Sequence, residues 1–228
     1  TMMLPHAEDV RDAISKWTTT DLPAHAGRRN NRHAGVLVPL RWRADLECVL
    51  ILRTAHLRSH PGEIGYPGGR PEPGDASLAD TALREAREEL GIESAELLGR
   101  MSSIPLFTSD FRLEPFVARI DQDVLTPEPG EVDRILIVCI GATLSLPHID
   151  AIPFHGWGAP MLSPVFDIGA HRMFGGTAHS FLELLQILAP LMGCAVPPLR
   201  PGRYTWADIK PEVGRGPRAA AGDPPAPR

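Results

Sequence analysis

The chain has 228 residues, of which 43% are hydrophobic and 22% are charged, a composition typical of a globular domain with a normal core. Its net charge of −5 disfavours a dedicated nucleic-acid-binding protein, because such proteins concentrate Lys and Arg against phosphates. We find no apolar segment of membrane-spanning length and no signal peptide, and the three cysteines form no disulfide framework. These features predict a cytoplasmic protein without a membrane partner.

Hydrophobic periodicity predicts an alternation of helices and strands, and therefore a mixed α/β fold. The predicted helices span 6–17, 77–90 and 177–192, the last with Thr177 as its N-cap. The predicted strands span 34–40, 47–53, 95–104, 112–121 and 134–140, with a further strand or hairpin in 165–174.

Clusters of Pro and Gly divide the chain. We expect an N-terminal helix and linker at 1–33, the main domain at 34–196, and a disordered tail at 197–228. Within the main domain, 149–164 is interpreted as a Pro/Gly-rich insertion. Its aromatic residues, such as Trp157, are expected either to stack on a ligand base or to bury a loop against the core.

The helix predicted over 77–90 carries three acids on one side. Glu88 and Glu89 follow Glu85 by three and four residues, a spacing that places all three on the same helix face. Carboxylates buried together repel one another unless a cation neutralises them. Oxygen ligands of this kind suit Mg²⁺ or Mn²⁺, and a solvated acidic helix face is the alternative interpretation.

The preceding loop favours the metal interpretation. Gly68 and Gly69 let the backbone approach a metal or phosphate closely, and Asp75 lies just before the helix. This combination resembles the Nudix box, G-x5-E-x7-R-E-U-x-E-E-x-G-U, in which U is a bulky apolar residue. Gly69 begins the match, and residues 84–92 complete it. The departures are Asp75 in the first acidic position, the small Ala86, and one additional residue between Asp75 and Arg84.

Residues 49–69 carry a narrower resemblance, to the coenzyme A pyrophosphatase group, with the pattern L-L-T-K-R-[SA]-x3-R-x3-G-x3-F-P-G-G. The matching residues are Leu50, Arg53, Arg58, Gly62, Pro67, Gly68 and Gly69. The departing residues are Ile51, Leu52, Thr54 and Tyr66. Segments 130–132 and 172–178 also resemble segments of that group.

The resemblance implies a Nudix α/β/α sandwich with a mixed central sheet, and metal-dependent hydrolysis of a diphosphate bond. The implied metal ligands are Glu85, Glu89, Glu88 and the carbonyl oxygen of Gly69. Glu88 is a further ligand or a base, Arg84 orients the acids, and Glu131 is either a distal base or a surface acid. Arg53, Arg58 and Gly68 are the implied substrate-binding residues, with surface ion pairs as the alternative for the two arginines.

Coenzyme A cleaved in this way gives phosphopantetheine and adenosine 3',5'-bisphosphate. Three alternatives stay open: a Nudix hydrolase acting on ADP-ribose, NADH, a dinucleoside polyphosphate or capped RNA; an isopentenyl diphosphate isomerase; and a non-catalytic ligand sensor. The expected partner is a small-molecule nucleotide, and a homodimer is compatible with the sequence.

Overall fold

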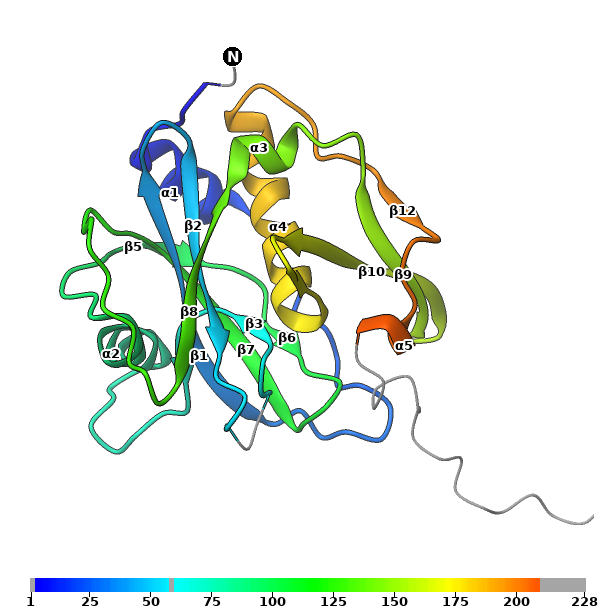
Figure 1. Ribbon diagram of the computed structural model, residues 1–228, viewed down its shortest axis with the longest axis horizontal. Coiled ribbons are helices and arrows are strands. Elements are labelled where there is room, and N and C mark those ends of the chain that lie inside the picture. The colour runs from blue at the N-terminus through cyan, green and yellow to red at the C-terminus, as the bar shows by residue number, and fades with distance from the viewer. Residues whose placement is uncertain (1–2, 58–59, 210–228) are drawn as a thin grey trace, which may run out of the picture.

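The computed structural model describes residues 3–57 and 60–209 (Figure 1). Its larger sheet has the strand order β3-β2-β1-β7-β5, with β4 also pairing with β1, β6 with β7, and β8 with β2. These strands are β1 (Arg32–Trp42), β2 (Leu46–Arg53), β3 (Ile64–Gly65), β4 (Gly68–Gly69), β5 (Glu96–Arg100), β6 (Ile104–Pro105), β7 (Phe111–Arg119) and β8 (Val132–Cys139). Since β1 and β7 are parallel while β1 and β2 are antiparallel, the sheet is mixed, as expected.

Helices cover both faces of this sheet. The described helices are α1 (Ala7–Lys16), α2 (Leu78–Leu90), α3 (Ile140–Leu144), α4 (Gly175–Leu191) and α5 (Trp206–Ile209). Figure 1 shows α2 on one side of the sheet and both α1 and α4 on the other. The α/β/α sandwich implied by the resemblance is therefore confirmed. In the described part of the chain, no helix is long and apolar enough to cross a membrane.

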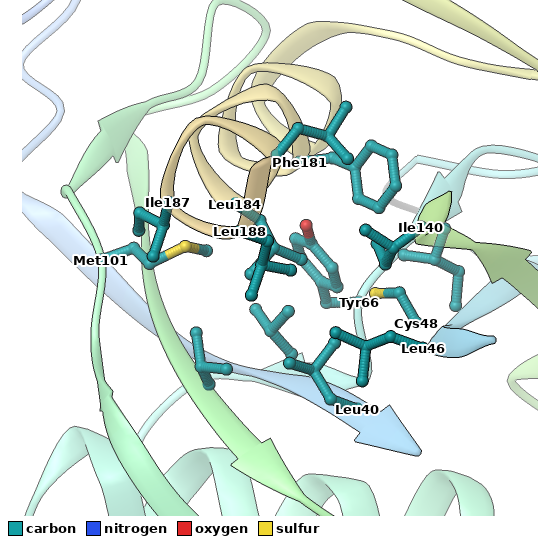
Figure 2. Close-up of a cluster of buried hydrophobic side chains, with 14 of the residues drawn as sticks. Leu40, Leu46, Cys48, Tyr66, Met101, Ile140, Phe181, Leu184, Ile187 and Leu188 are labelled. Atoms are coloured by element: carbon teal, nitrogen blue, oxygen red, sulfur yellow. The ribbon is translucent and has the colours of Figure 1, made fainter. Parts of the chain in front are cut away.

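Alternation along the central strands supplies both layers of the core. Leu37 of β1 packs with Ala82, Ala86 and Leu90 of α2. The neighbouring side chains of β1 and β2 point the opposite way, toward α4, and Figure 2 shows Leu40 and Cys48 packed there with α4 residues. Cys48 is fully buried, and this burial raises the pKa of its thiol, so the cysteine serves as a small core residue.

Close approach of α2 to β1 depends on Gly35. A Cβ atom at this position would lie 2.2 Å from the backbone oxygen of Leu78, in the first turn of α2. The absent side chain thus lets the helix that carries the acids pack directly on the central strand.

Residues 149–164, interpreted from the sequence as a Pro/Gly-rich insertion, do not form a loop. These residues form β9 (Ile149–Gly156) and most of β10 (Ala159–Ile168), joined at Trp157 and Gly158, whose φ angles are 50° and 79°. The smaller sheet has the order β11-β10-β9-β12, with β11 at His171–Met173 and β12 at Leu199–Pro201. In the described residues, β11 and β12 pair only with the far ends of the hairpin, at 166–168 and 149–151. The prolines in the rest of the hairpin therefore lie on edges without a described partner strand. At such an edge, the missing N–H of proline removes no hydrogen bond between strands.

Other boundaries also differ from the predictions. The strand predicted at 95–104 is two strands, β5 and β6, and α4 begins at Gly175 rather than after a Thr177 cap. Phe174 takes the N-cap position because it leaves β11 with an extended backbone (φ −147°, ψ 179°). Part of the predicted tail forms β12 and α5, and Tyr204 donates to the Asp167 carboxylate at 2.9 Å. The rest of that tail, 210–228, lies outside the described residues.

Candidate active site

The acids of the candidate site are held by one well-capped helix, α2. The hydroxyl oxygen of Ser77 accepts a hydrogen bond from the Asp80 N–H at 3.2 Å, and Gly91 ends the helix in the left-handed conformation. Both ends agree with the predicted helix.

Glu89 is the most deeply buried of these acids, with 2% of its surface exposed. Its Oε2 accepts a hydrogen bond from the Gly68 N–H at 2.8 Å, and its Oε1 lies 3.6 Å from Nη1 of Arg53. Among the described residues, no hydrogen-bond donor reaches Oε1. Burial raises the pKa of Glu89 to about 8, against the lowering effects of the Gly68 N–H and the Arg53 guanidinium.

Glu85 faces the glycine loop. A Cβ atom at position 69 would lie 2.3 Å from Oε1 of Glu85, so Gly69 lets the loop backbone approach this carboxylate. Burial raises the pKa of Glu85, while the Arg84 guanidinium opposes the shift. The negative charge of Glu131 contributes to the raised pKa values of both Glu85 and Glu89, although Glu131 itself is exposed.

Arg84 ties the loop to the helix. It donates to both oxygens of Asp75, from Nε and Nη2, each at 3.1 Å. Its Nη1 donates to Glu85 at 3.0 Å and to Glu88 at 3.1 Å. These hydrogen bonds hold the pKa of Asp75 well below its usual range. Arg84 thus contacts the acids that it is expected to orient, and it reaches Asp75 despite the additional residue between them.

The donor atoms of this site suit a hard divalent cation. Glu85 and Glu89 are adjacent, partly or fully buried carboxylates with raised pKa values, and Oε1 of Glu89 is an acceptor without a donor. A cation would satisfy that oxygen and remove the repulsion between the acids. Within the described ranges, however, no three His, Cys, Asp or Glu side chains are gathered into a metal-binding group. The Glu88 side chain, 58% exposed, pairs with Arg84 instead.

A pocket of about 910 Å³ adjoins these acids. Arg53, Gly68 and Gly69 line it on the side of the metal-ligand candidates. Aromatic side chains line another part, where His25 stacks on Trp157 with ring centroids 4.9 Å apart. The indole N–H of Trp157 also donates to the Pro23 carbonyl at 2.9 Å, so the N-terminal segment and the β9–β10 hairpin form this wall together.

Most of the residues that the sequence analysis singles out converge here. The structure brings together Arg53, Gly68, Gly69, Arg84, Glu85, Glu88 and Glu89. Arg58 lies outside the described residues. Sequence reasoning missed Arg32 and Arg70, which line the pocket beside Phe111. One signal in the sequence could have identified Arg32. Side chains alternate along β1, so Arg32 lies on the same face of the strand as Val36, which also lines the pocket.

Comparisons with known proteins identify the same family as the sequence motif. The family model described as "NUDIX domain" matches residues 31–140. An uncharacterized Nudix hydrolase of Photorhabdus laumondii, NudL, is 39% identical over 161 residues, covering 69% of this chain and 85% of that relative. NudL of Yersinia enterocolitica is 37% identical over 97 residues, covering 42% of this chain and 49% of that relative.

Solved structures show weaker similarity. A MutT/nudix family protein of Enterococcus faecalis has a TM-score of 0.46 at 13% identity, covering 84% of this chain and 76% of its own. An Ap4A hydrolase of C. elegans has a TM-score of 0.41 at 18% identity, covering 50% of this chain and 83% of its own. The P. laumondii relative establishes the assignment, and the family model agrees with it: this chain belongs to the Nudix hydrolases, enzymes that act as pyrophosphohydrolases and generally use divalent metal ions.

Proposed function

We propose that this enzyme hydrolyses the diphosphate bond of coenzyme A or its derivatives, with Mg²⁺ or Mn²⁺. The observation that carries the proposal is the position of Arg53. This residue of the coenzyme A pyrophosphatase pattern lies 3.6 Å from the buried Glu89 carboxylate and lines the adjoining pocket. Its Nε is buried without an acceptor among the described residues, as expected of a guanidinium that receives a phosphate oxygen.

Glu85, Glu89 and the carbonyl oxygen of Gly69 would hold the metal, and Glu88 would serve either as a further ligand or as a base. When bound, the metal supplies charge neutralisation at the diphosphate and lowers the pKa of water. Arg84 acts as a positioning residue, because its hydrogen bonds fix both the loop acid Asp75 and Glu85.

The chain's own residues then account for substrate placement and proton transfer. Arg53 donates to the diphosphate oxygens and holds one phosphorus in position for attack by water. The bridging P–O bond breaks, and the products are phosphopantetheine and adenosine 3',5'-bisphosphate. Glu88 or Glu131 accepts the proton that the attacking water releases.

Substrate comparison tests this proposal. The full chain is incubated with Mg²⁺ or Mn²⁺ and with coenzyme A, ADP-ribose, NADH or diadenosine polyphosphates, and kcat/KM is measured for each by product chromatography. We expect coenzyme A to have the highest value, and EDTA to abolish turnover. A preference for ADP-ribose or another dinucleotide would contradict the coenzyme A assignment, and tight binding without turnover would indicate a ligand sensor.

A further inference from the structure

Two arginines at the pocket share one aromatic ring. The guanidinium carbon of Arg32 lies 4.4 Å from the ring centroid of Phe111, and that of Arg70 lies 4.8 Å from the same centroid. All three residues line the pocket. Neither arginine forms an ion pair with a described carboxylate, so no described anion compensates either charge.

The sheet places these residues together. Arg32 and Phe111 are register partners on the parallel strands β1 and β7. Gly69 pairs with Gly35 farther along β1, so Arg70 leaves β4 beside the same strand. The backbone oxygen of Arg70 also accepts a hydrogen bond from Arg84 at 2.9 Å. The arginine pair is therefore built on elements that the active site already fixes.

No described carboxylate that lines the pocket forms an ion pair with either arginine. The described carboxylates that line the pocket are Glu63 and Asp110. Glu63 pairs with His60 at 2.9 Å, and Asp110 accepts a hydrogen bond from the Arg29 N–H at 3.0 Å. The remaining lining arginine, Arg53, lies beside Glu89. The pocket thus has two groups of positively charged side chains. Arg53 lies next to the catalytic acids, and Arg32 and Arg70 lie over Phe111.

We propose that Arg32 and Arg70 bind a phosphate monoester of the substrate that is distinct from the diphosphate cleaved, namely the 3'-phosphate of coenzyme A. Stacking on Phe111 covers one guanidinium face but leaves the N–H edges free, and those edges match phosphate oxygens in bidentate geometry. A dianionic phosphate that contacts both guanidinium groups would compensate both of these charges. ADP-ribose, NADH and dinucleoside polyphosphates lack this monoester, so the arginine pair selects among Nudix substrates. The inference rests on the function proposed above.

Kinetics with coenzyme A and 3'-dephospho-coenzyme A test the assignment. We expect the wild-type enzyme to favour coenzyme A by about tenfold or more in kcat/KM, since losing one charge-assisted hydrogen bond lowers affinity by at least about that factor. Arg32→Met or Arg70→Met should lower that preference about tenfold, mainly by raising KM for coenzyme A. Arg32→Lys should recover part of it, because the charge returns without the bidentate fork. The matched control is Arg119→Met, since Arg119 also stacks on an aromatic ring, that of Trp42, but does not line the pocket.

The outcomes separate this inference from the proposed function. Equal losses for both substrates, or no change in either, would overturn the assignment of the arginines. If neither substrate is hydrolysed, the proposed function fails, and calorimetry with adenosine 3',5'-bisphosphate and adenosine 5'-monophosphate then tests the arginine site alone. The site stands if the bisphosphate binds more tightly and both Met variants abolish the difference. It falls if the two nucleotides bind equally.

Discussion

At position 69, a side chain would occupy space that the Glu85 carboxylate already fills. Because the added Cβ of a Gly69→Ala variant would lie 2.3 Å from Oε1, Glu85 must move away from its place beside the loop. Moving a catalytic group by about 1 Å can lower turnover about 100-fold. We expect Gly69→Ala to lose activity on this scale while its Tm changes little. Gly74→Ala is the control, because its Cβ would meet nothing within 4 Å. Equal kcat values for the two variants would argue against a role for this contact.

His179, which lines the pocket, makes the stability of the folded chain depend on pH. Burial lowers its pKa to about 4 from an ordinary value of 6.5, with a smaller contribution from His25. The unfolded chain therefore takes up a proton first as pH falls. The stability due to neutral His179 is present above pH 6.5 and is lost as pH falls toward 4.

Urea unfolding at pH 7 and pH 4.5 measures this effect. The loss of unfolding free energy between these pH values should be smaller in His179→Gln than in the wild type, by at most about 3 kcal/mol. Parallel pH profiles for the two proteins would show that His179 is not shielded from water in the folded state.

At the scale of elements, the packing of α2 on β1 is the decisive contact. A Gly35→Ala variant would place a Cβ 2.2 Å from the Leu78 carbonyl oxygen and push the helix away from the sheet. Overpacking of this kind destabilises a domain by about 1–3 kcal/mol. We expect a Tm lower by several degrees, whereas Gly65→Ala, where a Cβ meets nothing within 4 Å, should leave Tm nearly unchanged. A Gly35→Ala protein as stable as the wild type would show that the interface can relax.

Elements with strong local signals could be predicted from the sequence, and the others could not. The α2 helix has both caps and an apolar stripe, so its bounds follow from local chemistry. The β9–β10 hairpin contains prolines and a tryptophan in a left-handed turn, which local rules assign to a loop. Its strands accommodate the prolines because the outer edges at those positions have no partner strand among the described residues, and that is a property of the tertiary structure. The candidate site divides in the same way: the box acids follow from one motif, whereas Arg32 and Phe111 meet only when β1 pairs with β7.

Across the whole molecule, the pocket depends on a segment that precedes the Nudix domain match. Asn30 is 2% exposed, and its side-chain amide donates to the carbonyl oxygens of Leu106, Ser109 and Phe111 at 2.9–3.0 Å. These hydrogen bonds attach the N-terminal segment to the loop between β6 and β7 and to the first residue of β7, so that His25 can reach Trp157. The expectation that residues 1–33 are only a helix and linker therefore omitted part of the pocket wall.

An Asn30→Ala variant measures this attachment. It leaves buried carbonyl groups without their donor and places Ala at a φ of 42°, so we expect a loss of about 2 kcal/mol or more in chemical unfolding. The KM for the nucleotide substrate should rise as well. Asn30→Gly is the control for backbone strain, because Gly tolerates this φ. Full stability in Asn30→Ala would contradict the attachment.

Glu89→Gln measures whether the buried acids of α2 catalyse metal-dependent diphosphate hydrolysis, as we propose. The Gln side chain keeps an oxygen that can accept the Gly68 N–H but cannot carry the negative charge. The measurement is the rate of adenosine 3',5'-bisphosphate release from coenzyme A at saturating Mg²⁺, together with Tm as the control for folding. We predict a kcat at least about 100-fold below that of the wild type, with Tm preserved. A kcat within about twofold of the wild type would contradict the account.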